Sequence, residues 1–182
     1  MSYMLNTNSK DLPYRKNVGL MIINSQKKIF MGQRVKGMAW QMPQGGIDGN
    51  ETPEQAAIRE LYEETGITKE KVNKISISKV WKTYEFPDEL IPKLWNGRYR
   101  GQIQKWFLFQ YIGKDSDINI SSTEQEFSNW CWTNTNDLLR LIVPFKKAVY
   151  IDVIDEFRDK IEKLEWVRYC LLYTSPSPRD RG

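Results

Sequence analysis

Alternating apolar and polar positions along the chain predict several β-strands separated by short turns. Residues 104–112 contain the aromatic and aliphatic run Trp106-Phe107-Leu108-Phe109, which is typical of a central strand. Residues 75–84 alternate polar and apolar side chains, as a strand with one buried face does. The pattern predicts further strands at residues 18–24, 28–34 and 127–133.

Two segments carry helical signals. The first follows Thr52, a good N-cap, with Pro53 at the first helical position and Gln55 completing a T-x-x-Q capping box. Gly66 is placed to end this helix in a left-handed conformation. The second is expected near the end of the chain, where apolar side chains recur at helical spacing: Tyr150, Ile154, Phe157, Ile161 and Leu164.

The order of these elements predicts an α/β fold in which a mixed sheet is packed between helices. Residues 40–43 lead from the second strand toward the first helix, and residues 87–100, with two prolines and a glycine, read as an irregular excursion. We expect residues 1–13 to be flexible and residues 14–169 to form one domain. Residues 170–182 resemble a translated sequencing adapter, and their composition also allows a disordered Ser/Pro-rich tail, so we leave them out of the fold.

Composition excludes several kinds of protein. A chain of 182 residues is long enough for one sizeable core. It shows no signal peptide or membrane-length apolar run, and two cysteines suggest a reducing, cytoplasmic setting. The absence of histidine excludes His-based zinc sites and Ser-His-Asp triads. The formal charge of +4 permits an anionic partner without requiring one.

Three carboxylates on the first helix are the strongest candidate for chemistry. Glu60, Glu63 and Glu64 stand at i, i+3 and i+4, so they share one helix face with Cβ atoms about 5–6 Å apart. A glutamate-rich face is usually only a solvated surface. So many like charges nevertheless favour a cation between them, and Mg²⁺ prefers oxygen ligands completed by substrate phosphates. The glycines before the helix, among them Gly45, allow the backbone to approach a ligand closely.

The same stretch resembles a known family. It matches every fixed position of the Nudix box, G-x5-E-x7-R-E-U-x-E-E-x-G-U, where U is aliphatic. The matching residues are Gly45, Glu51, Arg59, Glu60, Leu61, Glu63, Glu64, Gly66 and Ile67. The resemblance implies a Nudix fold, an α/β/α sandwich, and a hydrolase that acts on phosphoanhydride bonds.

Phrases outside the box resemble one branch of that family, which contains the bacterial RNA pyrophosphohydrolases and the dinucleoside polyphosphate hydrolases, in its alphaproteobacterial form. They include Trp40-Gln41-Met42-Pro43-Gln44 and Gln104-Lys105-Trp106-Phe107, and the likeness covers residues 14–157. It implies removal of phosphate or pyrophosphate from tri- or diphosphorylated RNA, leaving a 5′-monophosphate, with no DNA or membrane partner. Hydrolysis of dinucleoside polyphosphates such as diadenosine tetraphosphate is the alternative.

The resemblance also implies roles for single residues. Glu60, Glu63 and Glu64, with the Gly45 carbonyl and the distal Glu126, would bind Mg²⁺ or Mn²⁺, and Glu60 would also accept a proton from the attacking water. Glu51 and Arg59 would pair and hold the loop, a structural role. The implied substrate-binding residues are Arg15, Arg34, Lys105, Phe145 and Lys146. Arg34 and Phe145 would enclose a nucleobase, although Phe145 is equally compatible with core packing, and the basic residues would contact phosphates.

A third reading is a catalytically silent RNA- or nucleotide-binding module on the same fold. The intact set of Glu60, Glu63, Glu64 and Glu126 argues against it, since a pure binder has no need of so much negative charge beside phosphates.

Overall fold

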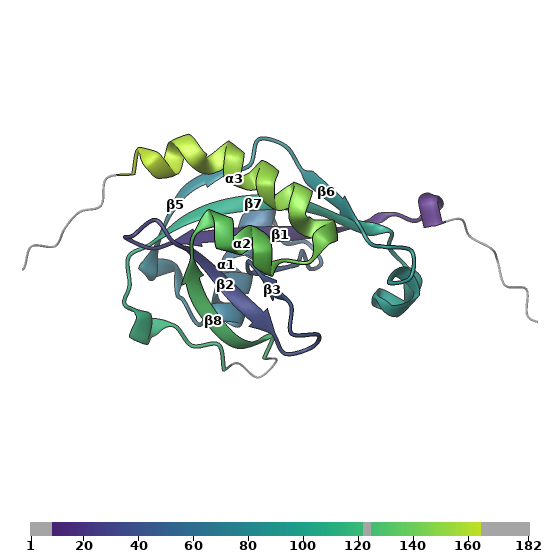
Figure 1. The fold of residues 1–182 in the computed structure, drawn as a ribbon, viewed down its shortest axis with the longest axis horizontal. Helices are drawn as coiled ribbons and strands as arrows, with labels where there is room; N and C mark the ends of the chain where they lie inside the picture. The colour runs from purple at the N-terminus through teal and green to yellow at the C-terminus, as the bar shows by residue number, and fades with distance from the viewer. Residues whose placement is uncertain (1–8, 122–124, 165–182) are drawn as a thin grey trace, which may run out of the picture.

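A mixed eight-stranded sheet lies at the centre of the computed structural model, which describes residues 9–121 and 125–164 (Figure 1). The strands are β1 (Tyr14–Ile23), β2 (Ile29–Arg34), β3 (Trp40–Gln41), β4 (Gln44–Gly46), β5 (Val72–Ile77), β6 (Lys82–Glu85), β7 (Gly101–Tyr111) and β8 (Phe127–Thr133). The helices are α1 (Pro53–Thr65), α2 (Thr135–Leu141) and α3 (Lys147–Glu162). Short 3₁₀ turns are η1 (Ser9–Asp11), η2 (Lys69–Lys71), η3 (Ile91–Lys93), η4 (Trp95–Gly97), η5 (Asp115–Asp117) and η6 (Pro144–Lys146).

Strands β1 and β7 form the middle of the sheet and run parallel, from the pair Tyr14–Gly101 to the pair Ile23–Gln110. The path through the sheet is β3-β2-β1-β7-β5, and β4, β6 and β8 pair with β1, β7 and β2. All pairs other than β1–β7 are antiparallel. The predicted mixed sheet is therefore confirmed.

Helices cover both faces of this sheet. On one face α1 buries Leu61 with Leu20 and Phe107. On the other face α3 buries Tyr150 and Phe157 with Trp106 and Met21, and α2 adds Leu138. Figure 1 shows α2 and α3 in front of the sheet and α1 behind it. Alternate residues of β1 and β7 serve the two cores because successive side chains of a strand point to opposite faces. The α/β/α sandwich expected from the sequence is confirmed.

Helix α1 begins and ends where the sequence predicts. The Thr52 hydroxyl accepts a hydrogen bond from the Gln55 N–H at 3.2 Å, and the Gln55 side chain accepts one from the Thr52 N–H at 2.8 Å. This reciprocal box satisfies two N–H groups that the first turn leaves without helical partners. At the other end Gly66 has a φ of +69°, and its N–H donates to the Tyr62 carbonyl at 2.8 Å.

Replacing Gly66 by alanine is expected to destabilise the protein by about 2–3 kcal/mol, since the left-handed backbone alone strains other residues. An added Cβ would also lie 2.6 Å from the Asn119 carbonyl oxygen. Gly49 is a matched control: its φ is +48°, but no atom of the described chain lies within 4 Å of a Cβ built there. Urea unfolding should show a loss of about 1 kcal/mol for Gly49→Ala. Equal losses for the two variants would show that the Asn119 contact contributes nothing.

One predicted strand is wrong. Residues 75–84 belong to two strands, β5 and β6, which pair with the same edge of β7 and are separated by a bend at residues 78–81. The Ser78 hydroxyl accepts the Trp106 N–H at 3.0 Å, so a side chain takes a hydrogen bond of β7 at the position where pairing stops. The bend places four residues opposite two residues of β7, and the sequence alternation hides it.

The other elements differ less from expectation. Helix α2 was not predicted, although the Asn134 side chain accepts the Asp137 N–H at 2.9 Å in a simple N-cap. Helix α3 begins at Lys147, three residues before the predicted apolar stripe. Residues 87–100 are irregular as predicted, with two 3₁₀ turns.

The division of the chain into domains stays a prediction. Residues 9–11 form η1, while the proposed tail at residues 170–182 lies outside the described residues. Across residues 9–121 and 125–164, no helix has the length and apolar character needed to cross a membrane.

Candidate active site

The carboxylates of α1 approach the backbone of β4. The Glu64 Oε2 atom accepts the Gln44 N–H at 2.9 Å. A Cβ atom at Gly45 would lie 1.8 Å from the carboxyl carbon of Glu60, so this position has room only for glycine. The helix and the glycine strand are thus packed so closely that Glu64 accepts a main-chain hydrogen bond and Glu60 lies against Gly45.

The guanidinium of Arg59 lies among these carboxylates. Its Nε and Nη2 atoms donate to the two Glu51 oxygens at 2.7 and 2.9 Å, forming the pair that the sequence predicts. Its Nη1 atom donates to Glu60 at 2.8 Å and to Glu63 at 2.9 Å, and Nη2 also donates to the Gly46 carbonyl at 2.8 Å. The positive group that the helix face needs is supplied here by the protein itself, beyond the loop-holding role expected from the sequence.

Burial shifts the acid–base behaviour of two of these glutamates. Desolvation raises the pKa of Glu60, and the neighbouring Arg59 partly offsets that rise. Desolvation also raises the pKa of Glu64 well above its usual value, and the Glu60 charge adds to the rise. Both carboxylates would therefore be stabilised in their charged form by a further cation.

The donor set fits a divalent cation in its chemistry. Glu60, Glu63, Glu64 and Glu126 all line one cavity, and they offer only oxygen ligands, which Mg²⁺ and Mn²⁺ prefer. In the part of the chain that the structure describes, however, no three Asp, Glu, Cys or His side chains lie close enough together to hold a metal ion. The hydrogen bonds of Arg59 to Glu60 and Glu63 explain the separation, because they direct both carboxylates toward the guanidinium. Metal binding by this set stays a prediction.

That cavity has a volume of about 1110 Å³ and brings together most of the predicted site residues. Those in its lining are Gly45, Glu60, Glu63, Glu64, Glu126, Arg15, Arg34, Phe145 and Lys146. They come from α1, β1, β2, β4, η6 and the segment before β8, which are far apart in the sequence. The fold therefore gathers basic, acidic and aromatic groups around one space.

Lys105 is the exception, and the structure does not place it with the others. Its Nζ atom donates to the Lys79 carbonyl at 3.2 Å and lies 6.0 Å from the centre of the Trp81 ring. Side chains alternate along β7, so Lys105 points to the face opposite Gln102 and Gln104. Gln102 lines the cavity and Lys105 does not, so the role of Lys105 as a phosphate ligand stays a prediction that this cavity does not support.

Arg34 and Lys146 face the cavity in different ways. The Arg34 Nη2 atom lies 3.8 Å from Glu126, and its buried Nε has no hydrogen-bond partner among the described residues. A buried N–H without a partner costs about 1–3 kcal/mol, so a ligand that accepts from it would bind favourably. Lys146 is buried in the lining of the cavity, and its Nζ donates to Gln41 at 2.9 Å and to Gln44 at 3.2 Å. Burial, together with the charge of Arg34, lowers the pKa of Lys146 to about 7.

An aromatic wall beside Phe145 was missed in the sequence. The ring centres of Tyr84 and Phe86 lie 5.9 and 6.3 Å from that of Phe145, and all three line the cavity. The Tyr84 hydroxyl donates to Gln102 at 2.8 Å, which fixes its ring. Alternation at the end of β6 places Tyr84 and Phe86 on one face, and this was the available signal. Phe145 is thus half-buried against aromatic rings and also borders the cavity.

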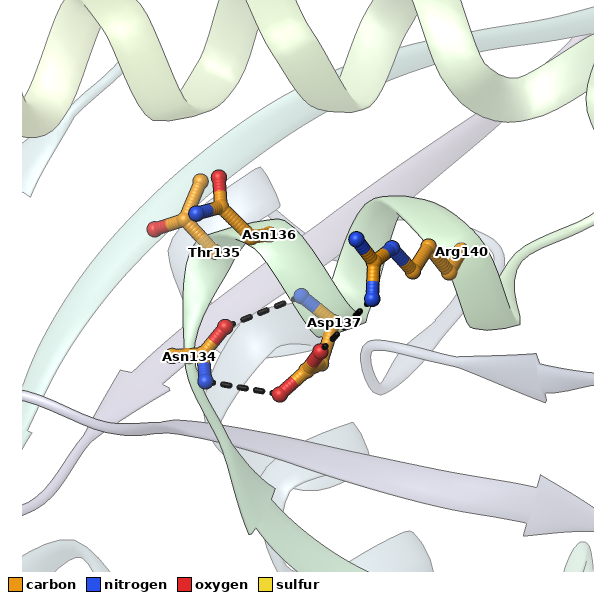
Figure 2. A pocket seen from close by; sticks show the side chains of 5 residues that line it. All are labelled: Asn134, Thr135, Asn136, Asp137 and Arg140. Atoms are coloured by element: carbon orange, nitrogen blue, oxygen red, sulfur yellow. Dashed lines mark hydrogen bonds and ion pairs between the residues drawn. The ribbon is translucent and has the colours of Figure 1, made fainter.

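A smaller hollow lies at the start of α2, away from this site (Figure 2). Its polar groups bind each other: Asn134 caps the helix through Asp137, and Arg140 lies 3.7 Å from Asp137. These contacts account for the cluster as a helix cap, and no function is assigned to it.

Sequence comparison relates the chain to one protein family and to named relatives. The NUDIX domain profile matches residues 13–153. A Roseobacter denitrificans protein named RNA pyrophosphohydrolase is 51% identical over 148 residues, which cover 80% of this chain and 92% of that protein. Proteins of the same name from Novosphingobium aromaticivorans and Rickettsia typhi are 53% and 49% identical, over 96% and 100% of their lengths and 82% and 87% of this chain.

Solved structures agree on the fold. A Caenorhabditis elegans Ap4A hydrolase in a binary complex superposes with a TM-score of 0.59 at 22% identity, covering 79% of this chain and 98% of that chain. The Escherichia coli dihydroneopterin triphosphate pyrophosphohydrolase gives 0.63 at 20% identity, covering 78% and 96%. At these identities the likeness concerns the fold alone.

Proposed function

This chain belongs to the NUDIX domain family, and on that premise we propose that it is a pyrophosphohydrolase of the 5′ end of RNA. It hydrolyses a phosphoanhydride bond of tri- or diphosphorylated RNA and leaves a 5′-monophosphate. Relatives named RNA pyrophosphohydrolase, about half identical over nearly their whole length, support this substrate. The structural observation that carries the proposal is the cavity in which the α1 carboxylates face Arg15, Arg34 and Phe145.

NUDIX hydrolases generally use divalent cations, and we propose Mg²⁺ here, with Mn²⁺ as a substitute. Glu60, Glu63, Glu64, Glu126 and the Gly45 carbonyl are the proposed ligands. When bound, the cations neutralise phosphate charge and lower the pKa of a coordinated water. Their binding requires Arg59 to release Glu60 and Glu63, while its two bonds to Glu51 can hold the loop in place.

The protein's own groups supply the rest of the chemistry. Glu60 is the proposed acceptor of the proton from the attacking water, since it faces Gly45 and is buried. A general base must hold a proton briefly, and burial that raises the pKa of Glu60 favours this. Arg15 is the proposed ligand of phosphate oxygens. The Arg34 guanidinium, whose Nε has no partner among the described residues, is proposed to face the base together with Phe145.

We propose that the enzyme works in the cytoplasm. An RNA substrate and a chain with only two cysteines are both compatible with that reducing compartment. Hydrolysis of 5′-triphosphorylated RNA against diadenosine tetraphosphate, at equal concentrations with Mg²⁺, tests the substrate. Faster release of phosphate or pyrophosphate from RNA is expected. Faster cleavage of the dinucleotide would contradict the RNA assignment and favour the alternative that the sequence leaves open.

Replacing Phe145 by alanine is expected to lower kcat/KM for RNA about 5- to 150-fold, because stacking on a base contributes about 1–3 kcal/mol. The loss should be similar for different first nucleotides, since every base has a face to stack. Ile151, exposed on α3 and absent from the cavity lining, provides a control for loss of an apolar side chain. Steady-state kinetics on folded variants measure both. An unchanged kcat/KM for Phe145→Ala would assign Phe145 to packing alone.

A further inference from the structure

The excursion between β6 and β7 brings one tryptophan to the edge of the cavity. Trp95 lines the cavity, and its ring stacks on Phe86 with centres 5.6 Å apart and planes at 23°. The backbone there is unusual: Trp95, Asn96 and Gly97 have φ angles of +45°, +56° and +70°. A bulky residue with positive φ is strained, and such strain persists where surrounding contacts hold it. The backbone of this segment and the contact with Phe86 therefore hold the Trp95 ring in a defined position.

The guanidinium of Arg15 lies over that ring. Its central carbon is 4.9 Å from the centre of the Trp95 ring, within the range of a cation–π contact. Arg15 comes from the start of β1, eighty positions before Trp95 in the sequence. Within the described residues Arg15 makes no ion pair with a carboxylate, and no side-chain hydrogen bond fixes its head.

Arg15 also reaches strand β4, which packs against the carboxylates of α1. A Cβ atom built at Gly46 would lie 2.1 Å from Arg15 Nη2, so the guanidinium passes over this glycine at close range. The preceding residue, Gly45, is the one whose missing side chain leaves room for Glu60. The head of Arg15 is thus held between Trp95 and Gly46, beside the carboxylates, with its N–H donors left for a ligand.

We propose that Trp95 is a positioning residue, whose ring holds the Arg15 guanidinium over Gly46 so that its donors meet the terminal phosphates of the RNA. The inference rests on the proposed function. An arginine on a flexible stem loses conformational freedom when it binds, and a ring that already fixes the planar guanidinium reduces that loss. An aromatic face does this without occupying the N–H donors, and Phe86 behind the ring keeps it in place.

A double-mutant cycle tests the coupling. Trp95→Ala and Arg15→Ala are each expected to raise KM for triphosphorylated RNA, by about 5-fold and at least 10-fold, with kcat within about twofold. The double variant should match Arg15→Ala, because the ring acts through that arginine. Trp95→Phe should recover most of the loss. Losses that multiply in the double variant would overturn the proposal.

Trp81 provides a matched control. Its ring also carries a cation, Lys105 at 6.0 Å, but neither residue lines the cavity. Trp81→Ala is expected to leave KM and kcat unchanged. An equal rise of KM for Trp81→Ala and Trp95→Ala would contradict a specific role of Trp95.

Binding separates this inference from the hydrolase assignment. Trp95→Ala is combined with Glu63→Gln, in which no turnover is expected, and compared with Glu63→Gln alone. The affinities of both proteins for RNAs with a 5′-triphosphate or a 5′-hydroxyl end are measured by fluorescence anisotropy. Circular dichroism checks that the variants are folded. Trp95→Ala should weaken binding of the triphosphate RNA and leave the hydroxyl RNA unchanged. Equal weakening of both RNAs would mean that Trp95 contacts a base, and no weakening would mean that it does not position Arg15; either result overturns the proposal. This readout holds even if the wild-type protein hydrolyses neither substrate.

Discussion

Replacing Glu64 by glutamine is expected to reduce metal-dependent hydrolysis about 10²- to 10⁴-fold, because stabilisation of charge by a bound cation is worth several kcal/mol. The same substitution should stabilise the metal-free protein near neutral pH. Glu64 is buried, and its carboxylate is desolvated beside Glu60. Glutamine keeps an oxygen that can accept the Gln44 N–H and removes the charge. A loss of activity joined to a gain in stability is the expected pattern for a site residue.

The raised pKa of Glu64 also predicts how the stability of the metal-free protein changes with pH. The pKa of Glu64 is raised in the folded protein above its value of 4.5, so the folded state holds the proton more tightly than the unfolded state. Stability from this group is therefore present below pH 4.5 and is lost as pH rises toward the folded pKa. Urea unfolding of metal-free Glu64→Gln should show a weaker decline with pH than wild type over this range.

Glu54→Gln is the control for this substitution. Glu54 lies on the same helix, is exposed, pairs with Lys74 and does not line the cavity, so both activity and stability should stay close to wild type. If Glu64→Gln hydrolyses RNA at the wild-type rate, the proposed metal set is wrong.

Replacing Arg59 by methionine is expected to destabilise the metal-free protein by about 2–4 kcal/mol, close to the cost of breaking a partly buried ion pair. Methionine keeps the apolar stem and leaves Glu51, Glu60 and Glu63 without their shared cation. Added Mg²⁺ should recover more stability in the variant than in wild type, since a cation can then occupy the place of the guanidinium. Urea unfolding with and without Mg²⁺ measures both effects.

The stability of Arg59→Met at acid pH provides a second measurement for the role of Arg59. Its guanidinium lowers the pKa of Glu51 to about 2, below the usual 4.5. Stability from that pair is present above pH 4.5 and is lost as pH falls toward 2. The difference in free energy of unfolding between wild type and Arg59→Met should therefore narrow over this interval. Arg158→Met is the control: its pair with Asp155 is exposed on α3 and should contribute at most about 0.5 kcal/mol. A loss for Arg59→Met no larger than this control would contradict the account of the carboxylate cluster.

The helix that carries the site could be read from the sequence because its signals are local. Thr52, Gln55 and Gly66 act on their own neighbours, and the spacing of Glu60, Glu63 and Glu64 fixes a shared helix face. The break between β5 and β6 could not be read, because it depends on Ser78 meeting Trp106 across the sheet.

The site itself was only partly predictable for the same reason. The resemblance supplied the residue types, but the depth of Lys146 and the outward direction of Lys105 follow from packing and strand register. Arg59 was expected to bind Glu51, and its further bonds to Glu60 and Glu63 depend on how its side chain lies in the folded protein. The aromatic wall depends on β6 and η6 meeting in space.

The most direct test of the central claim is the fate of 5′-triphosphorylated RNA incubated with this protein and Mg²⁺, with the 5′ end identified by mass spectrometry. The account predicts a 5′-monophosphate end with wild type and an unchanged triphosphate with Glu63→Gln, or when Mg²⁺ is removed by a chelator. An unchanged triphosphate with folded wild-type protein and Mg²⁺, or equal turnover by Glu63→Gln, would contradict it.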